Sequence, residues 1–221
     1  MRPGRFDSPV SSAQLAANTF GFFLNRGGDL LLPPEWSEET ARKVCLEKEL
    51  RFPWSGGRHP WLDVVIQTPS SLIAVEAKRY EPFRDAKKAE FPKKYWEECW
   101  GDNMKKFECM RDKLSEIPGH FLRLDAAQLV KHAFGLCTQA KKLRLAPVLA
   151  YLYAEPDDRH ANEEKKIAHR KEIKEFAQAV AGDEVRFVSC TYRDLLSLWQ
   201  AGSAAAAVRA HAQAVLDHYR P

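Results

Sequence analysis

Two carboxylates and a lysine stand inside apolar runs of this sequence. Asp63 lies within the run 60–67, and Glu76 and Lys78 close the run 72–78. Apolar runs of this length are typical of buried strands. Charged groups in such strands cost free energy unless they are paired or bind a metal ion. These three residues therefore need a chemical explanation.

The turn between the two runs predicts how these residues face each other. Pro69 and Ser70 are turn residues, and a two-residue hairpin loop at this point places Asp63 directly opposite Glu76. Opposed residues share a face with β-carbons roughly 5 Å apart, and Lys78 lies on that face too. Two negative charges at this distance repel by about 3 kcal/mol at an effective dielectric of about 20. A divalent cation such as Mg²⁺ would reverse that repulsion and could support phosphoryl chemistry.

The Glu-x-Lys spacing is weak evidence by itself, because it occurs four times. The copies that begin at Glu163, Glu164 and Glu172 lie in a charged stretch typical of a solvated helix face. Only the copy at Glu76 ends an apolar strand with an aspartate on the facing strand. The alternative for that copy is a structural Glu–Lys pair at a strand end.

Asp63 followed by Glu76-x-Lys78 on an adjacent strand resembles the PD-(D/E)xK nuclease superfamily, although Pro60 precedes Asp63 by three residues rather than one. The resemblance implies a restriction-endonuclease-like α/β fold, with a central mixed sheet (an antiparallel three-strand meander plus parallel strands) flanked by helices. It implies cleavage of DNA phosphodiester bonds with Mg²⁺, or Mn²⁺ as a substitute. Asp63, Glu76 and the Ala77 carbonyl would be metal ligands, with Asp63, Glu76 and Lys78 as the catalytic residues.

A further acidic ligand from the first helix is common in that superfamily. The segment 8–25 contains no acid, and its mid-helix polar candidates are Gln14 and Asn18. This departure leaves the third ligand open.

Glu49 is another candidate for that ligand. If residues 55–57 form the loop between strands at 44–53 and 60–67, Glu49 falls opposite Asp63, and Glu47 shares its face. The alternative is that both glutamates are solvent-facing charges on an edge strand.

Basic residues follow the Glu76-x-Lys78 motif, and aromatic residues are interleaved with them. Such a cluster could track a DNA backbone and stack against bases. The alternative is a mixed-charge surface, because five acidic residues lie between positions 81 and 98. The candidate nucleic-acid-binding residues are Arg79, Tyr80, Arg84, Lys87, Lys88, Lys93 and Lys94.

Size and composition predict one domain, residues 1–221, that is 45% hydrophobic and 29% charged. No apolar run is long enough for a membrane span, and the start of the sequence lacks the apolar segment of a signal peptide. Five cysteines without metal-site spacing favour reduced thiols and a cytoplasmic protein. The net charge of +4 suits a polyanionic partner such as DNA. No P-loop or serine-hydrolase motif appears.

Hydrophobic patterning predicts the elements that position these residues. We expect strands at about 44–53, 60–67, 71–78, 145–154 and 185–190. We expect helices from Pro9 to about 25 with Ser8 as N-cap, a short one capped by Ser37, a long one from about 92 to 118, and others over 125–139, over 162–181, from Thr191 and from Ser203.

The sequence thus predicts a Mg²⁺-dependent DNA nuclease, with endonuclease activity favoured over exonuclease activity. Double-strand cleavage would favour a homodimer. One alternative is a catalytically inactive nucleic-acid-binding or assembly module on the same fold, which the absence of a helix-one acid favours. A third alternative is an RNA target.

Overall fold

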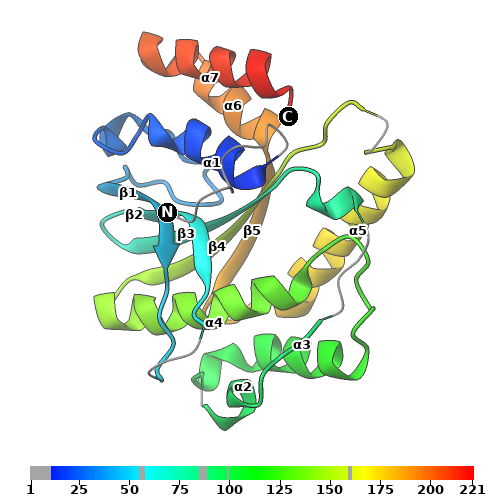
Figure 1. Cartoon of the computed structure of the whole chain (residues 1–221). Helices are drawn as coiled ribbons and strands as arrows, with labels where there is room; N and C mark the ends of the chain where they lie inside the picture. The colour runs from blue at the N-terminus through cyan, green and yellow to red at the C-terminus, as the bar shows by residue number, and fades with distance from the viewer. Residues whose placement is uncertain (1–10, 55–57, 85–88, 99, 159–160) are drawn as a thin grey trace.

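A five-stranded mixed sheet lies at the centre of the computed structural model, which describes residues 11–54, 58–84, 89–98, 100–158 and 161–221. The strands follow each other across the sheet in chain order (Figure 1). They are β1 (Lys43–Glu49), β2 (Trp61–Gln67), β3 (Ser71–Lys78), β4 (Ala146–Tyr153) and β5 (Arg186–Thr191).

Pairing within the sheet changes from antiparallel to parallel at β3. The first three strands form an antiparallel meander, and β3, β4 and β5 are parallel to each other. Parallel neighbours need crossover connections, and helices supply them on the way from β3 to β4 and from β4 to β5. The predicted restriction-endonuclease-like α/β fold, with its meander plus parallel strands, is confirmed.

The β2–β3 hairpin has the two-residue loop that the sequence predicts. Val64 faces Val75 and Gln67 faces Leu72. The Thr68 N–H closes the loop by donating to the Ser71 carbonyl at 3.0 Å. This register carries Asp63 and Glu76 to the other end of the hairpin.

The region around Ser37 is a turn rather than the expected short helix. The Ser37 hydroxyl does accept a hydrogen bond from the Glu39 N–H, at 3.1 Å. The Glu39 carboxylate then accepts from the Thr68 hydroxyl at 2.7 Å and from the N–H and hydroxyl of Ser70 at 2.9 and 2.7 Å. A tertiary role for Glu39 at the hairpin loop therefore replaces the helical one.

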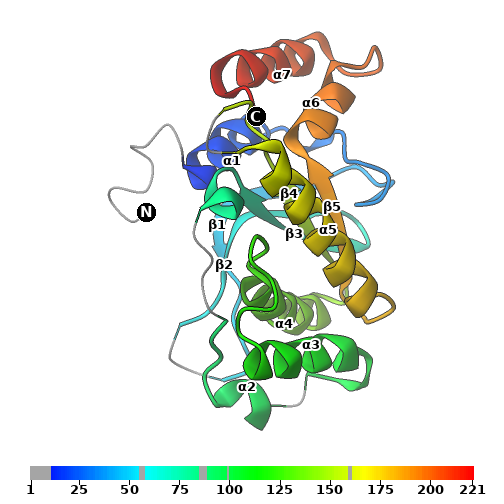
Figure 2. The same ribbon diagram turned by 90° about the vertical axis from the view of Figure 1, so that its right-hand side faces the viewer.

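One face of the sheet is covered by α1 (Ser12–Gly21), α6 (Tyr192–Gln200) and α7 (Ala206–Tyr219) (Figure 2). The core on this face gathers the inward side chains of β2 and β3 with aromatic residues of α1 and α6. Ser11 is the N-cap of α1, accepting from the Gln14 N–H at 3.3 Å. The cap predicted at Ser8 lies outside the described residues, and the helix begins later than expected.

The opposite face is covered by α4 (Ala126–Leu143), with α3 (Lys105–Glu116) packed behind it and α5 (Glu163–Val180) beside it. The side chains of Asp125, Asn162 and Thr191 cap α4, α5 and α6, at or next to the expected starts. Within the described residues, no helix is both long and apolar enough to cross a bilayer.

The long helix expected over 92–118 is divided. The short helix α2 (Lys94–Glu97) ends before Gly101, whose φ of +109° breaks the helical path, and α3 begins at Lys105. Trp100 stacks on Phe134 of α4, with ring centroids 4.1 Å apart. The Trp100 carbonyl accepts from Lys141 at 2.9 Å. Packing on α4 therefore overrides the local helical pattern.

Candidate active site

Asp63, Glu76 and Lys78 meet where β2 and β3 diverge. Val64 and Val75 form the last residue pair of the ladder. One step beyond it, the Lys78 ammonium donates to Glu76 Oε1, and the Asp63 carboxylate accepts from the Ala77 N–H at 2.8 Å. Glu76 is only 2% exposed. The structure therefore brings together the three residues that the hairpin register predicts to be neighbours.

Asp63 replaces a backbone partner at this point. Continuing the register would pair Ala77 with Leu62, yet the Ala77 N–H binds the Asp63 side chain instead. The N–H and C=O of one strand residue point toward the same neighbouring strand. The Ala77 carbonyl is therefore directed to the side on which Asp63 lies.

The two carboxyl groups have opposite pKa shifts. Burial would raise the pKa of Glu76, but the charges of Lys78 and His132 outweigh it and lower this pKa to about 2. Burial and the Glu76 charge together raise the pKa of Asp63 to about 8, against the opposing effects of Lys78 and the Ala77 N–H. The site therefore holds one carboxylate and one neutral carboxyl group at neutral pH.

Lys78 is kept charged by these neighbours. Burial would lower the pKa of Lys78, but the carboxylates of Glu76 and Asp63 raise it above its ordinary value. A lysine in this state donates hydrogen bonds and positive charge, and it has no lone pair with which to accept a proton.

Two further site residues come from α4 and were not predicted from the sequence. Gln128 Oε1 accepts from the Lys78 ammonium at 2.9 Å, and His132 Nδ1 lies 3.2 Å from Glu76 Oε2. Their four-residue spacing places both on one face of α4. Both are polar residues among the mostly buried residues of the first half of α4, but only the packing of α4 over β3 shows what they face.

The predicted position of Glu49 is wrong by two residues. Glu49 faces Trp61 rather than Asp63, and its carboxylate lies 3.4 Å from Arg51. The strand ends at Glu49 rather than near residue 53, so the connection to β2 is longer than the assumed three-residue loop.

Glu47 takes the position that was expected for Glu49. The pairs Leu46–Val64 and Lys48–Leu62 leave Glu47 and Asp63 between them, opposite each other but not paired in the ladder. The Glu47 charge is among the lesser causes, after burial and Glu76, that raise the pKa of Asp63. The φ angle of Glu47 is +48°, a left-handed conformation that is uncommon for a residue with a side chain. The third acidic group near this pair thus comes from β1.

Helix α1 reaches the loop after Lys78 through a hydroxyl group. Ser12 donates to Glu81 Oε1 at 2.6 Å, while Glu81 Oε2 accepts from the N–H groups of Arg79 and Tyr80 at 2.9 and 3.1 Å. Asn18 donates to the Tyr219 hydroxyl instead. Within its described residues, α1 therefore contributes hydroxyl and amide groups to these contacts and no carboxylate.

The prediction that Arg79 contacts DNA is wrong. Arg79 is 6% exposed, and its guanidinium donates to the Tyr219 carbonyl at 2.6 Å. It also lies over the rings of Tyr80 and Tyr219, 5.1 Å from each centroid. Side chains alternate between the two faces along a strand, so Arg79 points to the α7 side of the sheet, opposite to Lys78. Its contacts with Tyr219 stabilise the packing of α7.

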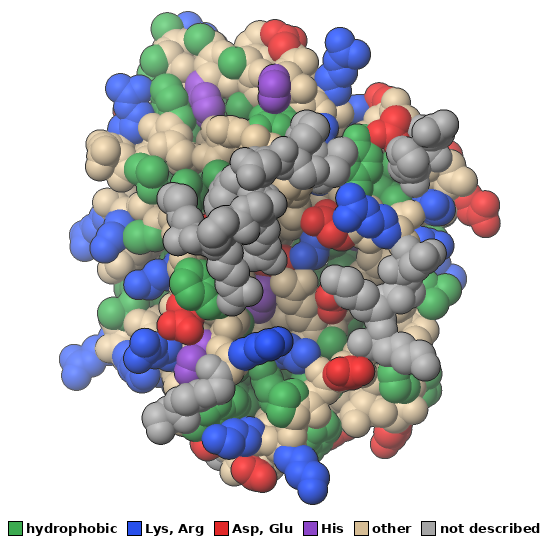
Figure 3. Space-filling view, viewed as in Figure 1, with side chains coloured by type: hydrophobic (Ala, Val, Ile, Leu, Met, Phe, Trp, Pro, Cys, Tyr) green, Lys and Arg blue, Asp and Glu red, His purple; other side chains and the backbone are tan. Residues whose placement is uncertain are grey.

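The other predicted nucleic-acid-binding residues divide into three groups. Tyr80 is half-buried beneath Arg79, and Arg84, Lys93 and Lys94 are exposed. Lys87 and Lys88 lie outside the described residues. Figure 3 shows lysine and arginine side chains on the lower part of the viewed face, with acidic side chains among them.

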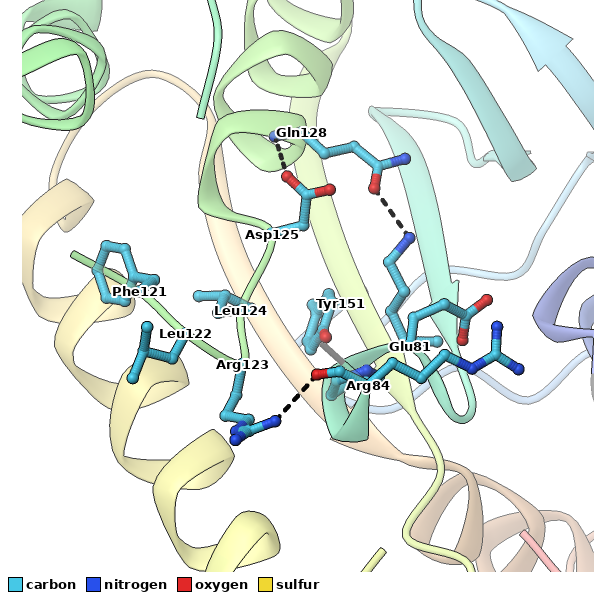
Figure 4. A pocket seen from close by; sticks show the side chains of 11 residues that line it. Glu81, Arg84, Phe121, Leu122, Arg123, Leu124, Asp125, Gln128 and Tyr151 are labelled. Carbon is cyan, nitrogen blue, oxygen red and sulfur yellow. Dashed lines mark hydrogen bonds between the residues drawn. The ribbon is translucent and has the colours of Figure 1, made fainter. Parts of the chain in front are cut away.

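Two hollows flank the start of α4. The first, which we call the Lys78 pocket, has a volume of about 120 Å³, and Lys78 and Tyr151 form part of its wall. Figure 4 shows Asp125 and Gln128 on one side of it and Arg84 and Arg123 on another. The second, which we call the α4 pocket, has a volume of about 750 Å³. Asp125 and Gln128 line both hollows, so they open on the same site.

The donor atoms of the site suit a hard divalent cation. Two adjacent carboxyl groups and a backbone carbonyl are oxygen donors, and Mg²⁺ is commonly held by one or two carboxylates together with waters and substrate phosphates. Among the described residues, no group of three or more His, Cys, Asp or Glu side chains forms a complete metal cage. Burial and the neighbouring Glu76 charge raise the pKa of Asp63, and a bound cation would offset both effects.

Comparison with known proteins agrees with this geometry. The family model described as "Restriction Endonuclease associating with ARP" matches residues 2–219. Searches of curated proteins and of solved structures gave no match. The matched range includes both strands of the site and α4. The chain therefore belongs to this family, which is restriction-endonuclease-like and of the PD-(D/E)xK kind.

Proposed function

We propose that this protein is a Mg²⁺-dependent endonuclease that hydrolyses phosphodiester bonds in DNA. The observation that carries the proposal is the meeting of Asp63, Glu76 and Lys78 at one end of the β2–β3 hairpin. Membership of a restriction-endonuclease family supports DNA as the substrate.

Asp63, Glu76 and the Ala77 carbonyl would hold the cation. Glu76 uses one oxygen with Lys78 and has the other near His132, and each carboxylate oxygen keeps a second lone pair for a metal. When bound, Mg²⁺ would polarise the phosphate and favour loss of a proton from water. Asp63 must lose its own proton before it can take part, because only the carboxylate is a good ligand.

Lys78 would orient the reacting groups and stabilise negative charge. In the hydrolysis a water oxygen bonds to phosphorus, the bond from phosphorus to a sugar oxygen breaks, the water loses a proton and the leaving oxygen gains one. Because Glu76 and Asp63 hold Lys78 in its charged form, its role is to donate hydrogen bonds to the phosphate or the incoming water. Gln128, 2.9 Å away, would fix the direction of the ammonium.

We assign the third acidic position to Glu47 instead of Glu49. Glu47 lies opposite Asp63, between the pairs Leu46–Val64 and Lys48–Leu62, whereas Glu49 is two residues further along β1 and engages Arg51. The strained backbone at Glu47 supports this choice, because left-handed conformations of ordinary residues concentrate at functional sites.

A plasmid assay tests the proposal. Supercoiled DNA should be converted to open-circular or linear forms with Mg²⁺ or Mn²⁺ and stay intact in EDTA. Lys78→Ala and Asp63→Asn should each lower the rate by about 10²-fold or more, with circular dichroism spectra like that of the wild type. Lys171→Ala, which removes an exposed lysine of α5, is the matched control and should cleave normally.

Two results would overturn the proposal. One is metal-dependent cleavage by Lys78→Ala at the wild-type rate. The other is wild-type protein that binds the plasmid and never nicks it with either metal, which would establish the catalytically inactive binding module instead.

A further inference from the structure

The α4 pocket lies beside the candidate active site and is larger than the Lys78 pocket. Its inner wall includes Gln128 and His132, the residues that contact Lys78 and Glu76. Its outer wall includes Trp54, Arg58 and Lys94. Whatever occupies this hollow therefore lies next to the proposed cleavage site.

One wall of the pocket is a fixed aromatic ring. Trp54 stacks on Phe52, with centroids 4.5 Å apart and ring planes 25° from parallel. Tyr95 and Trp100 meet the Trp54 ring edge-on, each at 5.7 Å. The Lys94 ammonium lies over the same ring, 6.0 Å from its centroid. A ring held this firmly can stack against a planar ligand without losing rotamer freedom.

The pocket also carries three cations and two acidic residues. Arg58, Lys94 and Lys131 line it together with Glu90 and Asp125, whose charges act on Lys131, but none of the three cations forms a salt bridge with another described residue. Lys131 is half-buried, with its ammonium 5.1 Å from the centroid of the Phe91 ring. A cation partly removed from water is stabilised by an anion, and a phosphodiester chain supplies anions at regular spacing.

We propose that the α4 pocket binds an unpaired nucleotide of the DNA substrate, with its base against Trp54 and its phosphates at Arg58, Lys94 and Lys131. A ring face inside a hollow is open only to a base that has left the duplex stack. The substrate would therefore be DNA with a single-stranded segment beside the cleaved bond, such as a flap or a splayed end. This assignment rests on the proposed nuclease function.

Binding in EDTA tests the pocket without any need for cleavage. The probes are a fully paired duplex and the same duplex with a single-stranded flap that carries 2-aminopurine. The flap should bind roughly tenfold more tightly, and 2-aminopurine fluorescence should be quenched on binding. Trp54→Leu should lose most of that preference and the quenching. Trp61→Leu is the matched control, because Trp61 is an exposed tryptophan outside the pocket.

A second variant that changes charge tests the pocket independently, so the test does not depend on the folding of Trp54→Leu. Lys94→Gln with Lys131→Gln should weaken flap binding and reduce its salt dependence, since fewer counterions are released. Equal wild-type affinity for flap and duplex, or unchanged quenching in Trp54→Leu, would overturn the proposal. Tighter binding of the same flap sequence made of RNA would overturn the DNA assignment.

The two proposals fail separately. If flap binding depends on Trp54 while no metal supports nicking, the nuclease function fails and the pocket assignment stands. If the protein nicks plasmid but binds flap and duplex alike, the pocket assignment fails and the nuclease function stands.

Discussion

The carboxyl groups at the two ends of the β2–β3 hairpin, Glu39 and Asp63, have pKa shifts in opposite directions. At the loop end, Glu39 accepts three hydrogen bonds from Thr68 and Ser70, and these bonds lower its pKa. At the open end, Asp63 and Glu76 are crowded together, and burial and mutual repulsion raise the pKa of Asp63 to about 8.

This difference distinguishes a structural end of the hairpin from the end that holds the candidate active site. Glu39 is satisfied by its donors, so its charge stabilises the loop. Asp63 keeps an unfavourable neighbour, a pattern that proteins retain at sites where a ligand or a reaction provides the compensation. The hairpin therefore fixes its register at the loop and uses that register to hold crowded acids at the other end.

We expect the largest effect from replacing the acidic residues of β1, which lies beside the open end of the hairpin. We expect Glu47→Gln to lower the rate of plasmid cleavage by about 10–100-fold, because it removes a charge facing Asp63. Glu49→Gln is the matched control and should cleave within about twofold of the wild type, since Glu49 lies at the exposed edge with Arg51. The opposite order of the two variants would return the third acidic position to Glu49.

The pH dependence of metal binding should show which acid changes its protonation state. Because the pKa of Asp63 is about 8 and that of Glu76 about 2, binding of Mg²⁺ below pH 8 must displace a proton from Asp63. Affinity should therefore fall about tenfold for each pH unit below 8. Calorimetric titration at several pH values measures this. A flat profile from pH 6 to 9 would refute the assignment, and Asp63→Asn should itself give a flat profile.

Replacing a carboxylate should change the Tm in opposite directions at the two ends of the hairpin. A raised pKa means that the native state retains the Asp63 proton longer, so the stability it contributes at low pH is lost between about pH 4 and about pH 8. In EDTA, Asp63→Asn should therefore raise the Tm relative to the wild type by about 5 °C at pH 8.5 and by less at pH 5.

Glu39→Gln is the counterpart at the loop end. Its lowered pKa means that Glu39 stabilises the protein above the ordinary glutamate pKa and loses this contribution as the pH falls through the lowered value. The Tm of Glu39→Gln should thus be lower than that of the wild type at pH 7, with the gap closing in acid. Equal Tm changes of one sign in both variants would remove the distinction between the ends.

Local sequence determined the strands, the hairpin loop and the principal site residues. A two-residue Pro-Ser loop leaves one register for the hairpin, so the residue order alone places Asp63, Glu76 and Lys78 together. The starts of α4, α5 and α6, at or next to Asp125, Asn162 and Thr191, were predicted from local patterns as well.

The longer connections between strands could not be predicted from local sequence in this way. The connection from β1 to β2 is not a tight turn, so counting outward from an assumed loop placed Glu49 where Glu47 lies. Arg79 looked like one of several surface cations, and only the approach of Tyr219 from the far end of the chain shows that it is buried.

Only the tertiary packing determined which residues surround the candidate catalytic residues Glu76 and Lys78. Gln128 and His132 reach Lys78 and Glu76 because α4 crosses the parallel half of the sheet, and no local pattern specifies which strand a helix covers. The α4 pocket likewise joins Trp54 and Lys94 to α4 across long sequence separations. Short-range turn geometry determined which candidate catalytic residues meet, whereas the long-range packing of helices on the sheet determined their partners and the shape of the proposed substrate site.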